Sequence, residues 1–163
     1  MLIYSFPSVS AANARILILG TMPGIPSLMA GEYYGNVRNN FWKLMFTILD
    51  VPFSADYTVK KTVLIENRIA LWDVLQACKR EGSLDSAIEQ EIPNDFTAFL
   101  EQHPEITHIF FNGQKAAAYF KKYVTTSKKY ELVVLPSTSP ANAGKNFESK
   151  LKEWENIRKP IGR

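Results

Sequence analysis

The stretch RILILGTMPG, residues 15–24, sets the expected fold of this chain. It begins as a short run of branched apolar side chains, typical of a buried parallel strand, and then breaks into a loop with glycine and proline. Three later stretches repeat the pattern: IALWDVL at 69–75, HIFFNG at 108–113 and YELVVLPS at 130–137. The sequence therefore predicts about four short parallel strands, each followed by a loop.

Helical patterns separate the predicted strands. The clearest lies at 41–49, where apolar residues follow the i, i+3, i+4, i+7, i+8 spacing of an amphipathic helix. Further helices are predicted over 58–67, 94–102, 114–123 and 146–158. Strands that alternate with helices form a parallel sheet covered on both faces, so we expect a three-layer α/β/α sandwich. Ligands bind such folds beyond the carboxyl ends of the strands, where GTMPG, FNGQ and LPSTSPANAG lie.

Length and composition favour one domain over residues 1–163. The chain is 46% hydrophobic, which is enough to bury a core without disulfides or a structural metal. Its one cysteine, Cys78, excludes a disulfide framework and Cys-rich metal sites. The first residues lack the pattern of a signal peptide, and no stretch approaches the roughly 20 apolar residues of a membrane span. We therefore expect a cytoplasmic protein with no membrane partner.

Charge divides the chain. Residues 1–113 contain 8 Lys and Arg against 12 Asp and Glu, a net −4, whereas residues 114–163 contain 11 against 4, a net +7. A basic region of this kind suits either a surface that faces phosphates or ordinary solvated helix faces, and charge alone does not decide between them.

The stretch YYGNVRNNFW, residues 33–42, concentrates aromatic rings and neutral amides. Rings can stack on a nucleic-acid base, and amides can bind a base or a water molecule without a charge that repels phosphate. Asn39 has a second interpretation as the N-cap of the following helix, and both roles can hold at once. Phe41 and Trp42 fall in the apolar helix and are expected in the core.

Four motifs together resemble the uracil-DNA glycosylase superfamily: GTMPG, YYGNVRNNFW, ALWDVL followed by REGSLD, and LPSTSPANA. Their order and spacing, from about Arg15 to Asn142, are most similar to the hypoxanthine-DNA glycosylase branch, also called DNA-deoxyinosine glycosylase. The resemblance implies a monofunctional, monomeric glycosylase of base excision repair, which hydrolyses the N-glycosidic bond of a deaminated base in DNA, with hypoxanthine first and uracil second. The alternatives are a non-catalytic nucleic-acid-binding module on the same fold and a small-molecule enzyme. The loop GTMPG argues against a small-molecule enzyme, because it lacks the several glycines of dinucleotide-binding loops and the Gly-Lys-Ser/Thr of P-loops.

The resemblance also implies site residues. Most branches carry Asn or Asp in the first loop to position the attacking water, and GTMPG has neither, so this catalytic role passes to Asn39. Tyr34 is expected to stack under the flipped base, with Tyr33 as a weaker candidate. The residues expected to wrap the nucleotide are Gly20, Thr21, Met22, Pro23 and Gly24.

The second loop, LPSTSPANA, has Leu135 where the best-known uracil branch carries a catalytic histidine. Its small or polar residues, among them Pro140 and Ala141, do not predict a strong wedge into the duplex. Its alternative interpretation is a turn that binds no ligand. The residues expected to bind DNA phosphates are Ser137, Thr138, Ser139, Asn142 and Lys145.

Two polar residues at strand ends keep alternative interpretations. Asn112 suits either reading of a base edge or stabilisation of the turn before Gly113. Asp73 lies on an apolar strand and needs a partner if buried, either an arginine such as Arg80 or the contents of a pocket. The two histidines have no acidic partners at metal-ligand spacing, so neither a metal nor another cofactor is expected.

Overall fold

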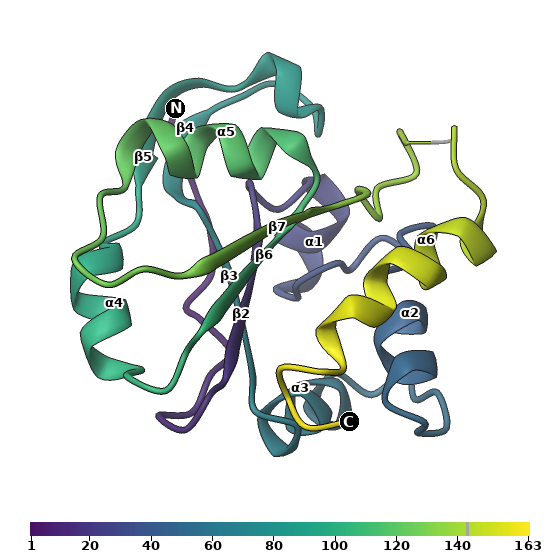
Figure 1. Ribbon diagram of the computed structural model, residues 1–163. Helices are drawn as coiled ribbons and strands as arrows, with labels where there is room; N and C mark the ends of the chain where they lie inside the picture. Colours follow the sequence, from purple (N-terminus) through teal and green to yellow (C-terminus); the bar gives the residue numbers. More distant parts are fainter. Residues whose placement is uncertain (143) are drawn as a thin grey trace.

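A computed structural model describes residues 1–142 and 144–163 and shows a central four-stranded sheet (Figure 1). All its neighbouring strands are parallel, and their order is β3-β2-β6-β7. The strands are β2 (Ile16–Gly20), β3 (Ile69–Asp73), β6 (His108–Asn112) and β7 (Glu131–Leu135). They match the four predicted strands, and the predicted α/β fold is confirmed.

Helices cover both faces of this sheet. In Figure 1, α4 and α5 lie on one side, and α2, α3 and α6 lie on the other. Their bounds are α1 (Ile25–Ala30), α2 (Phe41–Ile48), α3 (Tyr57–Glu66), α4 (Phe96–Gln102), α5 (Gln114–Tyr123) and α6 (Phe147–Trp154). Side chains of Asp56, Asp95 and Asn146 accept backbone N–H groups at the starts of α3, α4 and α6, which explains where these helices begin. None of the helices described is both long and apolar enough to cross a membrane.

The core divides into two apolar clusters, one on each face of the sheet. Ile16 and Ile18 of β2 belong to the cluster that contains Trp154 of α6, while Leu17 and Leu19 belong to the cluster of α4 and α5. Alternate side chains of a strand point to opposite faces, so one fully buried strand serves both layers.

A second, antiparallel sheet has the order β1-β4-β5, and the sequence did not predict it. Its strands are β1 (Ile3–Tyr4), β4 (Leu75–Lys79) and β5 (Glu89–Pro93). Residues 69–75 were predicted as a single strand, but β3 ends at Asp73 and β4 begins at Leu75. Between them, Val74 N donates to Gly20 O at 2.8 Å. The sequence does not reveal where β3 ends and β4 begins, because most residues on both sides of this bend are apolar and buried.

Candidate active site

A cavity of about 480 Å³ lies at the carboxyl ends of β2, β3 and β6. Its volume is in the range of sites that bind small molecules or a single nucleoside. The last residues of these three strands, Gly20, Asp73 and Asn112, all line it. Of the residues predicted to act on the base or on DNA, all but Lys145 contribute to its walls.

Gly20 allows two polar groups to approach the end of β2. A Cβ at this position would lie 2.7 Å from Asp73 Oδ1 and 2.8 Å from Tyr34 Oη, both closer than real Cβ contacts. Absence of a side chain at Gly20 therefore brings the carboxyl and the phenol to the same corner of the cavity.

The Asn39 side chain binds the start of α2, although Asn40 occupies the N-cap position, and its predicted role on the water stays a prediction. Phe41 N donates to Asn39 Oδ1 at 2.9 Å, so the side chain satisfies an N–H at the start of α2 and its oxygen is identified by the bond. The residue also lines the cavity. The second lone pair of Oδ1 and the Nδ2 hydrogens take part in no other hydrogen bond among the described residues. Asn39 thus presents a pre-oriented amide to the cavity.

Tyr34 has a fixed ring. It packs on Phe41 with ring centroids 4.2 Å apart and planes inclined by 23°, so only its opposite face can stack on a ligand. Its backbone is left-handed, with φ 54, which is uncommon for a residue other than glycine. Burial, followed by the nearby Asp73, raises the pKa of the Tyr34 hydroxyl well above its ordinary value, so the hydroxyl stays neutral.

Tyr33 also lines the cavity, but it is only 2% exposed. Its hydroxyl lies 3.0 Å from the carbonyl oxygens of Phe6 and Pro7, to which it donates. Tyr33 thus anchors the segment before β2. Phe41 and Trp42 are 0% and 3% exposed, as expected for core residues.

Asn112 joins the predicted loops. Its Nδ2 donates to Tyr34 Oη at 3.1 Å and to Thr138 Oγ1 at 2.9 Å, and its Oδ1 accepts Thr138 N at 2.9 Å. Both amide hydrogens are therefore used within the protein, and only one acceptor position remains for a ligand. The structure places Asn112 in the wall and gives it the role of a connector between Tyr34 and the second loop.

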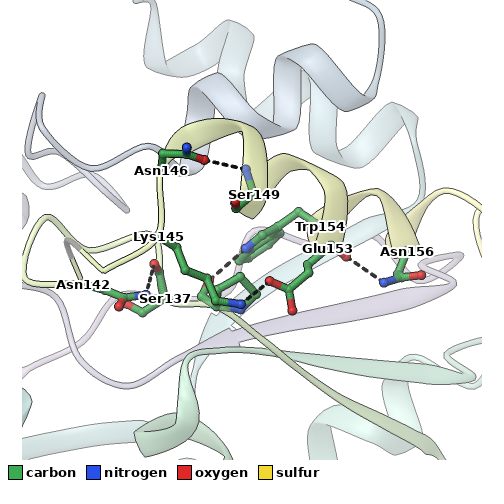
Figure 2. Close-up of polar contacts among 9 residues, drawn as sticks. Ser137, Asn142, Lys145, Asn146, Ser149, Glu153, Trp154 and Asn156 are labelled. Atoms are coloured by element: carbon green, nitrogen blue, oxygen red, sulfur yellow. Dashed lines mark hydrogen bonds and ion pairs between the residues drawn. The ribbon is translucent and has the colours of Figure 1, made fainter.

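The second loop bonds to itself through hydroxyl oxygens. Ser137 Oγ accepts Ser139 N, and Ser139 Oγ accepts Ala141 N, each at 3.2 Å. Asn142 Nδ2 donates to Ser137 O at 3.2 Å (Figure 2). A serine hydroxyl that accepts a backbone N–H keeps its own proton for donation, for example to a phosphate. The last residue of the predicted motif, Ala143, lies outside the described residues.

Lys145 lies outside the cavity. Its Nζ donates to Glu153 Oε2 on α6 at 2.5 Å, as Figure 2 shows. The side chain of Lys145 is 47% exposed, so this is a surface ion pair that a phosphate can compete for. Its predicted contact with DNA stays a prediction.

Asp73 lines the cavity and is 3% exposed. Its hydrogen-bond partner is not Arg80, the arginine that the sequence suggested. Ser5 Oγ donates to Asp73 Oδ2 at 2.6 Å, so pairing with Arg80 was the wrong alternative. Burial raises the pKa of Asp73 to about 7, against the lowering effect of the Ser5 bond. A neutral carboxyl both donates and accepts, as an amide does, so Asp73 can hydrogen-bond a base edge without adding a negative charge.

Arg80 instead organises the first loop and the REGSLD segment. It donates from Nη2 to Pro23 O and from Nε to Gly82 O, and its Nη1 lies 4.0 Å from Asp85 Oδ1. Through this arrangement Ser83, Leu84 and Asp85 join the cavity wall. No wall role was predicted for these three residues, because their local sequence shows only a turn, although REGSLD was part of the resemblance.

The cavity is polar without a cation. Among the described residues that line it there is no Lys, Arg or His. Its chemistry therefore rests on amides, hydroxyls, backbone groups and the carboxyls of Asp73 and Asp85, around one stacking ring. Such a set can orient a water molecule and hydrogen-bond a departing group, and it contains no amine for a Schiff base.

The chain is similar to known proteins in both sequence and fold. The family model for the Uracil DNA glycosylase superfamily matches residues 6–158. A protein named hypoxanthine DNA glycosylase from Methanosarcina acetivorans is 43% identical over 155 residues, which cover 93% of this chain and 95% of the relative. A protein of the same name from Methanosarcina barkeri is 36% identical over 150 residues, which cover 91% and 93%. A solution NMR structure from M. acetivorans, titled as a candidate uracil DNA glycosylase, matches with TM-score 0.84 and 38% identity over 100% of both chains.

Proposed function

Because this chain belongs to the uracil DNA glycosylase superfamily, we propose that it removes a deaminated base from DNA by hydrolysing the N-glycosidic bond. Hypoxanthine is the first substrate proposed, since two relatives that cover most of the chain are named hypoxanthine DNA glycosylase, and uracil is the second, after the name of the superfamily. The observation that carries the mechanism is the pre-oriented amide of Asn39 in a cavity with Tyr34.

The reaction begins with base flipping, because a base inside a duplex is out of reach. The flipped base enters the cavity and stacks on the free face of Tyr34. The residues at 20–24 surround it, and Asp73, whose pKa burial raises to about 7, hydrogen-bonds its edge in the protonated form. Ser137 and Ser139 hold the phosphates beside the flipped nucleotide with their hydroxyl protons.

Asn39 acts on the water. Its Oδ1 is held by Phe41 N and keeps one lone pair, which accepts a hydrogen bond from the water and directs the water oxygen at the sugar carbon. Bond cleavage places positive charge on the sugar and negative charge on the departing base. The neutral donors of the wall stabilise that negative charge, and a protonated Asp73 adds no charge that would repel phosphate.

Replacement of Asn39 tests this assignment. Asn39→Ala should lower the single-turnover excision rate by at least about a hundredfold, the scale of losing one preorganised polar group, while DNA binding survives. Asn40→Ala is the matched control, because it removes the neighbouring amide, which makes no cap bond and does not line the cavity. Near-normal excision by the Asn39 variant, with an intact fold, would sink the assignment.

A panel of labelled duplexes that contain hypoxanthine, uracil or xanthine then decides the substrate. An alkali-labile abasic site marks excision, whereas binding without such a site would indicate the non-catalytic module.

One chain supplies all the described walls of the cavity, so we propose that the enzyme works as a monomer. We also propose that it works in the cytoplasm.

A further inference from the structure

The loop before α2 carries an apolar side chain that the mechanism above does not use. Val37 is 88% exposed, the largest exposure among the internal apolar residues described. It lies between Asn36 and Asn39, which both line the cavity, but it is not itself part of the wall. Single exposed apolar side chains are common, so it is the position of Val37 between two cavity residues, rather than its exposure alone, that makes it a candidate for contact with bound DNA.

The backbone around Val37 is held rigidly. Asn39 N donates to Asn36 O at 2.9 Å, which closes a β-turn with Val37 and Arg38 at its corners. Asn36 Oδ1 also accepts Arg38 N at 2.9 Å, and Asn40 N donates to Thr138 O at 3.3 Å. The two corner side chains therefore project from a turn whose both ends are fixed at the cavity.

Arg38 gives this turn a positive charge. Its side chain is exposed and takes part in none of the ion pairs found among the described residues. A valine and an unpaired arginine at one corner suit a polyanion that also offers apolar surface, which describes the bases and phosphates of DNA.

Base flipping leaves a gap in the stack, and proteins that deform DNA commonly fill such gaps with an apolar wedge. The second loop offers Pro140 and Ala141, which are small. Leu84 is 59% exposed but is itself part of the cavity wall. Met29 is 84% exposed but lies on α1, away from the cavity wall.

We propose that the turn Asn36–Asn39 is the element that enters the duplex, with Val37 in the space left by the flipped nucleotide and Arg38 at a neighbouring phosphate. The inference rests on the proposed function. It places the wedge two residues before Asn39, so one rigid turn both enters the duplex and presents the amide that positions the water.

The test compares duplex with single-stranded DNA of the same sequence, each containing hypoxanthine. A single strand has no stack to hold open, so a wedge matters only for the duplex. Val37→Ala should lower single-turnover excision from the duplex by at least about tenfold and leave the single-strand rate within about twofold. Val37→Leu should keep the duplex rate of the wild type, because leucine supplies an apolar side chain of at least the same size. Met29→Ala is the control and should change neither rate, while Arg38→Gln should flatten the salt dependence of duplex binding by about one unit.

A 2-aminopurine next to the lesion reports opening of the stack without any chemistry, and its fluorescence rise should be smaller with Val37→Ala. Two results would overturn the inference: a ratio of duplex to single-strand rates that Val37→Ala leaves unchanged, which includes an equal fall in both rates, or a fall confined to the duplex that Leu84→Ala produces and Val37→Ala does not. If the wild type opens the stack but releases no base, the proposed function fails, and the fluorescence of the Val37 variants still decides whether this turn enters the duplex.

Discussion

Replacement of Asp73 by asparagine should remove a pH dependence from the stability of the fold. The unfolded carboxyl ionises near pH 4, whereas burial raises the pKa of Asp73 in the fold to about 7. Between these values the folded protein holds a proton that the unfolded chain has released. The contribution of Asp73 to stability is therefore fully present below about pH 4 and is lost as the pH rises through about 7.

The magnitude follows from that window. Each pKa unit corresponds to about 1.4 kcal/mol, and a carboxyl with a pKa of about 7 is half ionised at pH 7, so between about pH 5 and pH 7 the wild type should lose about 2 kcal/mol through this group. The Asp73→Asn variant keeps an acceptor for Ser5 Oγ and has no group at this position that can ionise. The difference in free energy of unfolding between the variant and wild type should thus shift in favour of the variant by about 2 kcal/mol over these two pH units.

Urea unfolding at several pH values, followed by tryptophan fluorescence, measures this shift. Asp50→Asn, which removes a carboxyl that is 69% exposed and pairs with Arg158, is the control for removal of a negative charge at the surface. Parallel stability curves for wild type and Asp73→Asn would show that burial does not raise the pKa of Asp73, and the reasoning that Asp73 keeps its proton in the fold would be refuted.

Two further predictions concern binding. Tyr34→Ala should remove about 1 to 3 kcal/mol of stacking on the base. Its affinity for damaged duplex, measured by fluorescence anisotropy, should therefore fall more than its affinity for undamaged duplex. Tyr34→Phe should largely keep the wild-type affinity, because it keeps the ring. If Phe behaves like Ala, the hydroxyl bonded by Asn112 matters instead of the ring face. Lys145→Gln should flatten the salt dependence of binding by about one unit on both duplexes, and Lys129→Gln, on an exposed loop, should not. Equal slopes for all three proteins would mean that Lys145 serves only its pair with Glu153.

The arrangement of the site at one end of the sheet could be predicted from local patterns. Short apolar runs that end in GTMPG, FNGQ and LPSTSP identify parallel strands, and the carboxyl ends of such strands share one edge. Gly20, Asn112 and Ser137 meet at the cavity for this reason. The role of Asn39 came from the resemblance, since an Asn before a helix predicts only a cap.

The partners within the site could not be predicted in the same way. Asp73 bonds Ser5, which is 68 residues away, and the loop with Ser83 joins the wall through Arg80. The residues around Ser5 and Ser83 show no periodicity that would place them at the cavity. The antiparallel sheet was missed for a similar reason, because β1 has only two residues and β4 continues the apolar run of β3.

The sequence by itself determined the layers, the strand ends and the residue types available for chemistry, because hydrophobic periodicity acts over a few neighbouring residues. Only the tertiary structure decided what each polar group does. It commits both hydrogens of the Asn112 amide to Tyr34 and Thr138, leaves the Asn39 amide open to the cavity, and surrounds Asp73 with enough protein to keep its proton near neutral pH. Hydrogen-bond partners and desolvation depend on groups that are far apart in the chain, so they become defined only when the loops have packed together.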